Sequence, residues 1–317
     1  MHIVSLFSGC GGLDLGFINA GHKIIWANDF DADAVASYKT NIGDHIILGD
    51  IRQIESAAIP DCDMVIGGFP CQGFSLANLK RTESDERNKL YLEFYRVIRD
   101  KKPKYFVAEN VKGILSLGKG AVLNLIVEDF EEAGYNVTYK LINCADYGVP
   151  QIRQRVIFIG IRKDIDEVIE FPEPSHDEKE DSELLKWVSM KDALLHIPEP
   201  DENTTIPNHV YSAYKVFSNK NFTGHRVVDP DKPSPTILAR GNGGGGVVVI
   251  HHPNNHRRLS VREAATIQTF PIDFIFIGSK TSCYRQIGNA VPPLFAEKLA
   301  HQFSTSKKSL VATGGKR

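Results

Sequence analysis

The sequence predicts an α/β fold built on a mostly parallel β-sheet with helices on both faces. In the first half of the 317-residue chain, short apolar runs alternate with amphipathic stretches, and a glycine-rich turn follows the first run. Near residue 171 the composition changes and a less regular region begins. Strand–helix alternation indicates a parallel sheet because the connecting helices cover its two faces.

Seven apolar runs are predicted to be strands: residues 3–7, 23–28, 46–48, 64–67, 105–109, 136–142 and 156–161. Amphipathic patterns predict helices over residues 14–20, 31–40, 88–99, 121–133 and 291–303. The last of these helices is expected to return to the first domain. We therefore predict a first domain of residues 1–170 plus 284–305, a second domain of residues 171–283, and a flexible tail over residues 306–317.

The predicted second domain is divided into an acidic and a basic stretch. Residues 173–205 hold ten Asp and Glu against three Lys and Arg, whereas residues 206–262 hold eight Lys and Arg against two Asp. The acidic stretch is expected to form a solvated outer face. The basic stretch fits a phosphate-contacting surface, but a merely solvated surface fits the charge equally well.

The composition excludes several classes of protein. The net charge of −2 is not that of a strongly basic nucleic-acid binder. The five cysteines are an odd number and form no CxxC pair, so neither a disulfide framework nor a zinc site is expected, and a reducing, cytoplasmic setting is favoured. The N-terminus lacks the pattern of a signal peptide. No run of about 18 apolar residues occurs, so no membrane span is expected.

The glycine-rich turn, FSGCGGL at residues 7–13, predicts a ligand site at the carboxyl edge of the sheet. Glycines let the backbone turn sharply and approach a ligand closely. Asp29, which ends the second run, is placed to bind ribose hydroxyls, and Asp50, after the third run, to accept a hydrogen bond from an adenine amino group. The spacing is neither GxGxxG nor a phosphate loop, so an adenosine ligand without a pyrophosphate fits better. A purely structural turn is the alternative.

Cys71 follows the fourth predicted strand directly, within the segment FPCQGFS at residues 69–75. A buried structural cysteine would be the ordinary interpretation of an isolated Cys, but this position points the side chain toward the ligand edge. Glu109 ends the next strand and is expected beside Cys71, where partial desolvation would let it stay protonated and bind a heterocycle nitrogen.

Arg153 and Arg155 share one strand face because strand side chains alternate with a period of two. Surface arginines paired with carboxylates are the alternative.

Together these motifs resemble the cytosine-C5 DNA methyltransferase family of the bacterial restriction-modification type. The match covers nearly the whole chain outside residues 171–235. Its blocks, in the family's order, are FSGCGGLDLGF (7–17), NDFD (28–31), GDI (49–51), GGFPCQGFS (67–75), ENV (109–111), QIRQR (151–155), RRLSVREAATIQTFP (257–271) and QIGNAVP (286–292). Eight blocks in the same order make a chance match implausible.

The resemblance implies a Rossmann-like S-adenosylmethionine-dependent methyltransferase domain with a mixed, mostly parallel sheet, and a smaller, irregular target recognition domain. It also implies DNA (cytosine-5-)-methyltransferase chemistry without a metal. Cys71 would add to C6 of a flipped cytosine, and C5 would then take the methyl group. Glu109 would bind N3 and the exocyclic amine, and Arg155 would contact the base O2 and steady Cys71. Arg153 is expected to be a supporting or backbone contact.

The same resemblance assigns residues to S-adenosylmethionine and to DNA. The cofactor residues are Phe7, Gly9, Gly11 and Leu13 at the methionine end, Asp29 at the ribose, Phe30, Asp50 and Ile51 at the adenine, and Pro70, Asn289 and Ala290. Segment 73–90 resembles a loop that closes over the flipped base. The DNA candidates are Ser75, Lys80, Arg81 and Arg87 for phosphates, and Thr236, Ile237 and Arg240 in the recognition region, where Arg can pair with guanine. A plain turn without base contact is the alternative for each residue of the recognition region.

The implied partner is double-stranded DNA, bound by a monomer in the bacterial cytoplasm at the nucleoid. The expected role is to protect DNA from a cognate restriction endonuclease. A tRNA cytosine-C5 methyltransferase and an inactive DNA-binding homologue stay open as alternatives. The chain lacks the CFT-like tripeptide of the tRNA branch, and its intact set of Cys71, Glu109, Arg153 and Arg155 argues against an inactive protein. FPCQ in place of a DPPY-like motif argues against a nitrogen-directed methyltransferase.

Overall fold

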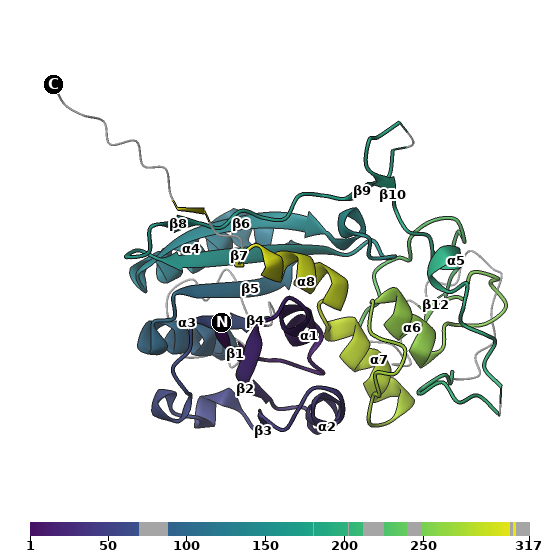
Figure 1. The fold of residues 1–317 in the computed structure, drawn as a ribbon, viewed down its shortest axis with the longest axis horizontal. Coiled ribbons are helices and arrows are strands. Elements are labelled where there is room, and N and C mark those ends of the chain that lie inside the picture. Colours follow the sequence, from purple (N-terminus) through teal and green to yellow (C-terminus); the bar gives the residue numbers. More distant parts are fainter. Residues whose placement is uncertain are drawn as a thin grey trace.

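The structure is a computed structural model that describes residues 1–69, 88–179, 181–201, 203–211, 225–239, 249–304 and 307–308. A seven-stranded sheet with the order β3-β2-β1-β4-β5-β7-β6 forms its centre (Figure 1). The strands are β1 (His2–Leu6), β2 (Lys23–Asp29), β3 (Ile46–Leu48), β4 (Met64–Gly67), β5 (Tyr105–Val111), β6 (Tyr135–Asn143) and β7 (Gln154–Arg162). All seven predicted strands are confirmed, and their bounds differ from the prediction by at most two residues at either end.

The first five strands are parallel, and β7 runs antiparallel to both β5 and β6. The sheet is therefore mixed and mostly parallel, as expected. Because β2 and β4 lie on opposite sides of β1, the connections that leave β1 and β4 diverge at their carboxyl ends. An open α/β sheet binds its ligands at such a switch point.

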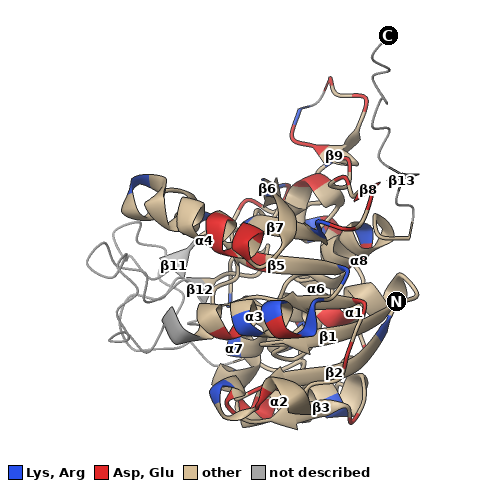
Figure 2. Cartoon of the chain, turned by 90° about the vertical axis from the view of Figure 1, so that its left-hand side faces the viewer, with Lys and Arg blue, Asp and Glu red and all other residues tan. Residues whose placement is uncertain are grey.

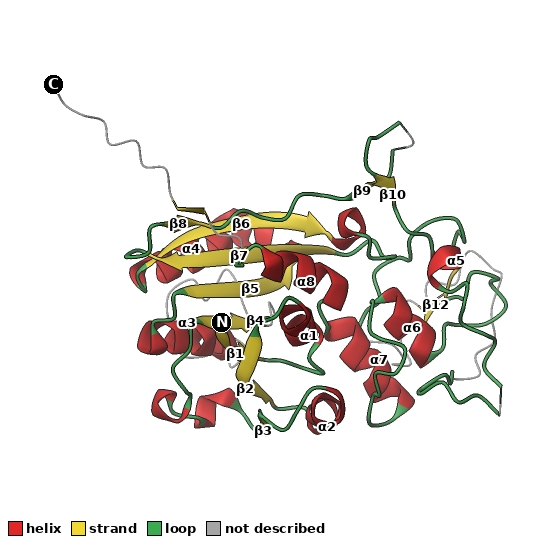
Figure 3. Ribbon diagram, in the orientation of Figure 1, coloured by secondary structure: helices red, strands yellow, loops and turns green. Residues whose placement is uncertain are grey.

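Helices cover both faces of this sheet (Figure 3). They are α1 (Gly12–Asn19), α2 (Ala32–Asn41), α3 (Asn88–Lys101), α4 (Ala121–Glu132) and, from the C-terminal part, α8 (Pro293–His301). Met64 and Ile66 of β4 point to the core under α1, α2 and α8, whereas Val65 points to the core under α3 and α4. This alternation follows from the two-residue period of a strand and explains why β4 is apolar throughout.

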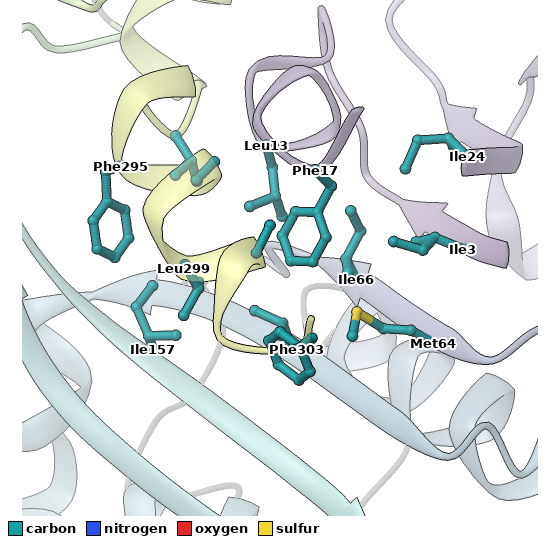
Figure 4. Close-up of a cluster of buried hydrophobic side chains, with 14 of the residues drawn as sticks. Ile3, Leu13, Phe17, Ile24, Met64, Ile66, Ile157, Phe295, Leu299 and Phe303 are labelled. Atoms are coloured by element: carbon teal, nitrogen blue, oxygen red, sulfur yellow. The ribbon is translucent and has the colours of Figure 1, made fainter. Parts of the chain in front are cut away.

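The C-terminal helix α8 packs directly on α1 and completes the first of these two cores. Phe295, Leu299 and Phe303 interdigitate with Phe17 of α1 and with Ile66 of the sheet (Figure 4). The predicted return of the C-terminal helix to the first domain is confirmed. Beyond it, Lys307–Lys308 (β13) pairs antiparallel with Glu167–Val168 (β8), and the rest of the predicted tail lies outside the described residues.

In its described part, the region 171–283 carries two-residue strands and helices of at most ten residues, the last of which extends to Asn289. They are β9 (His176–Asp177), β10 (Leu185–Lys186), α5 (Met190–Ala193), β11 (His225–Arg226), β12 (Val249–Ile250), α6 (Val261–Ile267) and α7 (Lys280–Asn289). A third core, which includes Val261, Phe270 and Ile287, also takes in Cys10 from the glycine-rich turn. The two regions therefore share a buried boundary.

The acidic stretch forms a solvated outer face, as expected. Glu178, Asp181 and Glu183 are exposed on the segment that connects β9 and β10, and the red colour in Figure 2 marks acidic residues on this segment and on α4. Within the described ranges, no helix is long and apolar enough to cross a membrane.

The close approach of α1 and α8 makes Gly16 a sensitive position. A Cβ added there would lie 2.3 Å from Cβ of Ala296 and 2.5 Å from the main-chain nitrogen of Glu297. We predict that Gly16→Ala lowers the free energy of unfolding by roughly 1–3 kcal/mol, because two helix backbones must separate. Urea denaturation measures the change. Gly49→Ala is the matched control: its Cβ would meet nothing within 4 Å, and its effect should stay within about 0.5 kcal/mol. Equal stability of the two variants would contradict this account of the helix contact.

Candidate active site

A cavity of about 650 Å³ opens at the carboxyl ends of β1, β2, β4 and β5. Its volume lies within the range of about 300–1,000 Å³ typical of ligand sites. The glycine-rich turn, the turn after β2, the ends of β4 and β5, and the end of α7 contribute its walls. The sheet order predicts a site at this place, and the cavity brings together residues from both ends of the chain.

The glycine-rich turn has the geometry that its sequence predicts. Phe7, Gly9 and Gly11 all have positive φ angles, of 55°, 56° and 90°. A Cβ on Gly11 would lie 2.3 Å from Cδ1 of Ile42 and 2.9 Å from the ring of Tyr38, so this glycine lets the turn pack against α2. A Cβ on Gly9 would meet nothing within 4 Å, because Gly9 lines the open cavity. The turn therefore serves both packing and ligand access.

The turn after β2 supplies the expected carboxylate and aromatic ring. Asp29 is 8% exposed, and its carboxylate accepts hydrogen bonds from the main-chain nitrogens of Gly9 and Asp31, each at 2.8 Å. Burial raises the pKa of Asp29. Phe30 lines the cavity and is 69% exposed, so its ring is free to pack against a ligand. Asp31 pairs with Arg285 of α7 at 2.7 Å, which ties this rim to the C-terminal wall.

Among the predicted cofactor residues that the structure describes, Gly11, Asp50 and Ile51 do not line the cavity. The Asp50 carboxylate pairs with Arg52 at 2.5 Å, and this pair lowers the pKa of Asp50. Ile51 is 2% exposed and packs in the core under α3 and α4. Contact of these residues with adenine stays a prediction, and it would require Asp50 to share its carboxylate with Arg52.

Asp14 is a buried carboxylate of this site that our sequence analysis missed. It accepts hydrogen bonds from Oγ of Ser5 at 2.7 Å and from the hydroxyl of Tyr38 at 2.9 Å. Desolvation raises its pKa to about 6. An Asp in the first turn of a helix is so common that no sequence pattern distinguishes Asp14. Its significance depends on Tyr38, which reaches it from α2.

The end of β5 places Glu109 where the chain leaves β4 toward Cys71. A Cβ on Gly68 would lie 3.0 Å from Oε2 of Glu109, and the Asn110 side chain donates to the carbonyl oxygen of Phe69 at 3.1 Å. Glu109 Oε1 lies 2.7 Å from Nε of Arg155. The two groups are misaligned, however, and in the described part of the chain Oε1 is buried without a hydrogen-bond partner. Glu109 and Arg155 both line the cavity, so this pair lies at its wall.

Several predicted residues lie outside the described ranges. They are Pro70, Cys71, Ser75, Lys80, Arg81, Arg87 and Arg240. Their roles stay predictions.

The two arginines of the QIRQR block differ in their surroundings. Arg155 lines the cavity beside Glu109. Arg153 is 1% exposed and donates to the main-chain oxygens of Ile237 and Gly288, at 3.3 and 3.0 Å. Arg153 thus contacts main chain of this protein, and its role in the site stays a prediction. Burial and the charge of Arg155 lower the pKa of Arg153 to about 9, so it stays protonated at neutral pH.

The C-terminal block and the recognition region meet beside these arginines. Asn289 and Ala290 line the cavity, as expected. The Thr236 hydroxyl donates to the main-chain oxygen of Ile152 at 2.6 Å, and Ile237 is only 5% exposed. The side chain of Ile237 therefore packs in the core between the two regions.

Part of the basic stretch proves to be buried. Arg257, Arg258 and Arg262 are each at most 5% exposed, and Arg257 forms a two-pronged ion pair with Glu263 at 2.7 Å. These three arginines stabilise the base of the second region and do not form a phosphate-contacting surface. The expectation of a phosphate-contacting surface is wrong for these arginines. Charge alone does not show which arginines have buried carboxylate or carbonyl partners.

A group of potential metal ligands lies next to Arg257. Donor atoms of Glu199, His252 and His256 come within 4.8 Å of one another, a grouping that sequence spacing does not reveal. Glu199 already accepts from Nε of Arg257 at 2.8 Å, and Nδ1 of His252 accepts from the main-chain nitrogen of Asn254 at 3.2 Å. These contacts describe an ion-pair network at the edge of α6.

Comparison with known proteins relates the whole of this architecture to one family. Residues 1–305 match the family model described as C-5 cytosine-specific DNA methylase. The chain is 42% identical to the Type II methyltransferase M.NgoFVII of Neisseria gonorrhoeae over 320 residues, covering 94% of this chain and 85% of that protein. It is 39% identical to the Type II methyltransferase M.BsuRI of Bacillus subtilis over 354 residues, covering 95% and 78%.

Solved structures show the same fold. A prophage-encoded Escherichia coli protein described as a DNA modification methyltransferase matches with a TM-score of 0.75 and 26% identity, covering 96% of this chain and 98% of that one. The Dnmt2 methyltransferase of S. pombe matches with a TM-score of 0.70 at 18% identity, covering 96% and 97%. At that identity the second match concerns the fold alone.

The buried Asp14 carboxylate makes stability depend on pH. Its pKa is raised from 3.8 to about 6 on folding, so the folded state takes up a proton between these values and loses stability as the pH rises through them. Relative to Asp14→Asn, the native chain should lose about 2 kcal/mol between pH 4 and pH 7. Urea unfolding of both proteins over this range tests the prediction. Asn in place of the exposed Asp231 is the control, with an effect within about 0.5 kcal/mol. A difference for Asp14→Asn that is constant with pH would contradict the prediction.

Proposed function

Since this chain belongs to the family of C-5 cytosine-specific DNA methylases, we propose that it transfers a methyl group from S-adenosylmethionine to C5 of a cytosine flipped out of duplex DNA. The observation that carries the proposal is the Glu109–Arg155 pair, which lines the cavity where the chain leads into Cys71. The exocyclic amine of cytosine is a donor that suits the carboxylate of Glu109. One cavity thus serves both the cofactor and the base.

The residues at the other end of the cavity fit S-adenosylmethionine. Asp29 is buried, and among the described residues no Lys or Arg pairs with it, so a ligand with hydroxyl or cationic groups suits it. Phe30 offers an exposed ring for the adenine. Phe7, Gly9 and Leu13 would hold the methionine end, and Asn289 and Ala290 would close the site. When bound, the cofactor supplies the electrophilic methyl group.

The chemistry at the base rests on Cys71, Glu109 and Arg155. The Cys71 thiolate would add to C6, and the electron pair would move to C5, which would take the methyl group as the S–CH3 bond of the sulfonium breaks and leaves a neutral thioether. Removal of the C5 proton and elimination of the thiolate then restore the aromatic ring. Glu109 offsets the charge that develops on the ring by hydrogen bonding to N3 and the amine. A free thiol has a pKa of about 8.5, and the positive charge of Arg155, which this proposal places beside Cys71, would favour the thiolate.

The target cytosine must leave the duplex to reach this site, which costs a few kcal/mol of stacking and pairing. Segment 73–90 would close over the flipped base and contact phosphates through Ser75, Lys80, Arg81 and Arg87. The region 171–283 would recognise the target sequence, with Thr236 and Arg240 near the DNA. Together with the catalytic domain, residues 1–170 plus 284–305, it would act as a monomer. The role that fits is protection of bacterial DNA, in the cytoplasm, from a cognate restriction endonuclease.

Replacement of the nucleophile tests the mechanism. Cys71→Ser should abolish methyl transfer and retain binding of S-adenosylmethionine, because a serine hydroxyl is far less acidic than a thiol. Bisulfite sequencing of plasmid DNA from expressing cells measures methylation and also reveals the target sequence. Cys62→Ser is the control: Cys62 is half-buried and does not line the cavity, so activity should persist. Turnover by Cys71→Ser would exclude the covalent route. Methylation of total tRNA but not duplex DNA would favour the RNA-directed alternative.

A mechanism-based trap tests the covalent bond itself. Duplex DNA with 5-fluorocytosine at the target should form an adduct that survives denaturing electrophoresis, because fluorine at C5 prevents the proton loss that releases Cys71. The adduct should require S-adenosylmethionine and should be absent from Cys71→Ser. DNA that binds but forms no denaturant-resistant adduct would rule out addition to C6.

A further inference from the structure

The segment 234–239 of the recognition region is built into the wall between the two regions. The main-chain nitrogen of Ser234 donates to the carbonyl oxygen of Pro150 at 2.9 Å, and that of Ile152 donates to the carbonyl oxygen of Ser234 at 2.8 Å. This short parallel bridge joins the recognition segment to the residues that lead into β7. The segment runs directly into residue 240, a candidate for base contact.

Both main-chain polar groups of Ile237 are bound by side chains of the QIRQR block. Its N–H donates to Oε1 of Gln151 at 3.1 Å, and its carbonyl oxygen accepts from Arg153 at 3.3 Å. Gln151 is fully buried. Because a buried peptide group must have a hydrogen-bond partner, the position of Ile237 is determined by these two side chains.

The same side chains reach the wall of the cofactor cavity. Nε2 of Gln151 donates to Oε1 of Gln268 at 2.5 Å, and Nε2 of Gln268 donates to the carbonyl oxygens of Ile287 and Ala290 at 2.9 and 2.8 Å. Gln268 is also fully buried. Ala290 lines the cavity. An unbroken chain of hydrogen bonds thus runs from Ile237, through two buried amides, to the cavity wall.

A second contact joins the same two places sterically. A Cβ on Gly288 would lie 2.4 Å from the main-chain nitrogen of Ala239 and 2.4 Å from the carbonyl carbon of Leu238. Gly288 lines the cavity and accepts from Arg153. Main chain from the recognition segment therefore lies directly behind the cavity wall, where it cannot shift without moving residues 287–290.

We propose that the buried Gln151–Gln268 amide pair couples target binding to cofactor binding, by transmitting the position of the recognition segment to the cavity wall at residues 287–290. This inference rests on the proposed function, because it takes segment 234–239 as part of the DNA-binding region. The two glutamines are positioning residues that touch neither ligand. DNA that orders the recognition segment would order the cavity wall, and the cofactor would do the reverse, since coupling between two sites is reciprocal.

The coupling is measured as a ratio of dissociation constants. S-adenosylhomocysteine is titrated into the full chain alone and into the full chain saturated with a duplex that carries the target found by bisulfite sequencing. We expect DNA to tighten binding by about 5-fold to 150-fold in the native protein. In Gln268→Met and in Gln151→Met the ratio should fall toward one, with a smaller change in the affinity measured without DNA. The double variant should lose no more coupling than either single variant, because the two amides form one link.

Matched variants separate coupling from mere loss of a buried hydrogen bond. Tyr284→Phe removes a buried hydrogen bond to the carbonyl oxygen of Leu259, 2.6 Å long, in the same part of the fold, and should keep the native ratio. Gln151→Asn retains the amide but is too short to reach both Ile237 and Gln268. It serves if the Met variants fail to fold, and it too should lower the ratio.

The outcomes distinguish the inference from the function on which it rests. A native ratio of one, or folded glutamine variants that keep the native ratio, would overturn the coupling and leave the proposed methyltransferase function intact. A native protein that does not bind S-adenosylhomocysteine at all would contradict the proposed function itself.

Discussion

The position of β1 between β2 and β4 is the constraint on which the site depends. Connections that leave these strands diverge, so the sheet opens at one edge, and every residue that ends one of these strands reaches that opening. Asp29 comes from β2, Glu109 from β5, and the exit toward Cys71 from β4. Residues far apart in the sequence are thereby collected at one edge of the sheet, together with the turns that follow β1 and β2.

The charges around the cavity are divided between its two ends. At the cofactor end Asp14 and Asp29 are buried among hydroxyls and main-chain N–H groups, and among the described residues neither has a Lys or Arg partner in an ion pair. Glu109 at the base end lies instead against Arg155. An uncompensated negative field suits a sulfonium cofactor, whereas a polarisable carboxylate–guanidinium pair suits a ring whose charge changes during reaction.

Sequence patterns predicted the strands because each is a short apolar run with a sharp end, and they predicted the cavity edge because strand order follows from the fold class. They could not predict how side chains pair across the fold. Asp50 appeared suited to adenine, but Arg52, two residues away, occupies it. Arg257, Arg258 and Arg262 appeared to be surface charge, but they are buried. Asp14 is bound by Tyr38 of another helix, and Gln151 is bound by Gln268, more than a hundred residues away. Partners so far apart leave no pattern in the sequence around either residue.

Arg153 and Arg155 show most clearly why spacing alone is insufficient. Their period of two predicts one shared face, and both do line the cavity. Arg155 lies within β7 opposite Val111, at the mouth of the site beside Glu109. Arg153 precedes the strand, where the chain passes under the recognition segment, and there the carbonyl oxygens of Ile237 and Gly288 compensate its buried guanidinium. A buried charge persists only where such acceptors surround it. The same residue type, two positions apart, can therefore pair with a carboxylate at the cavity wall in one case and hold two regions of the protein together in the other.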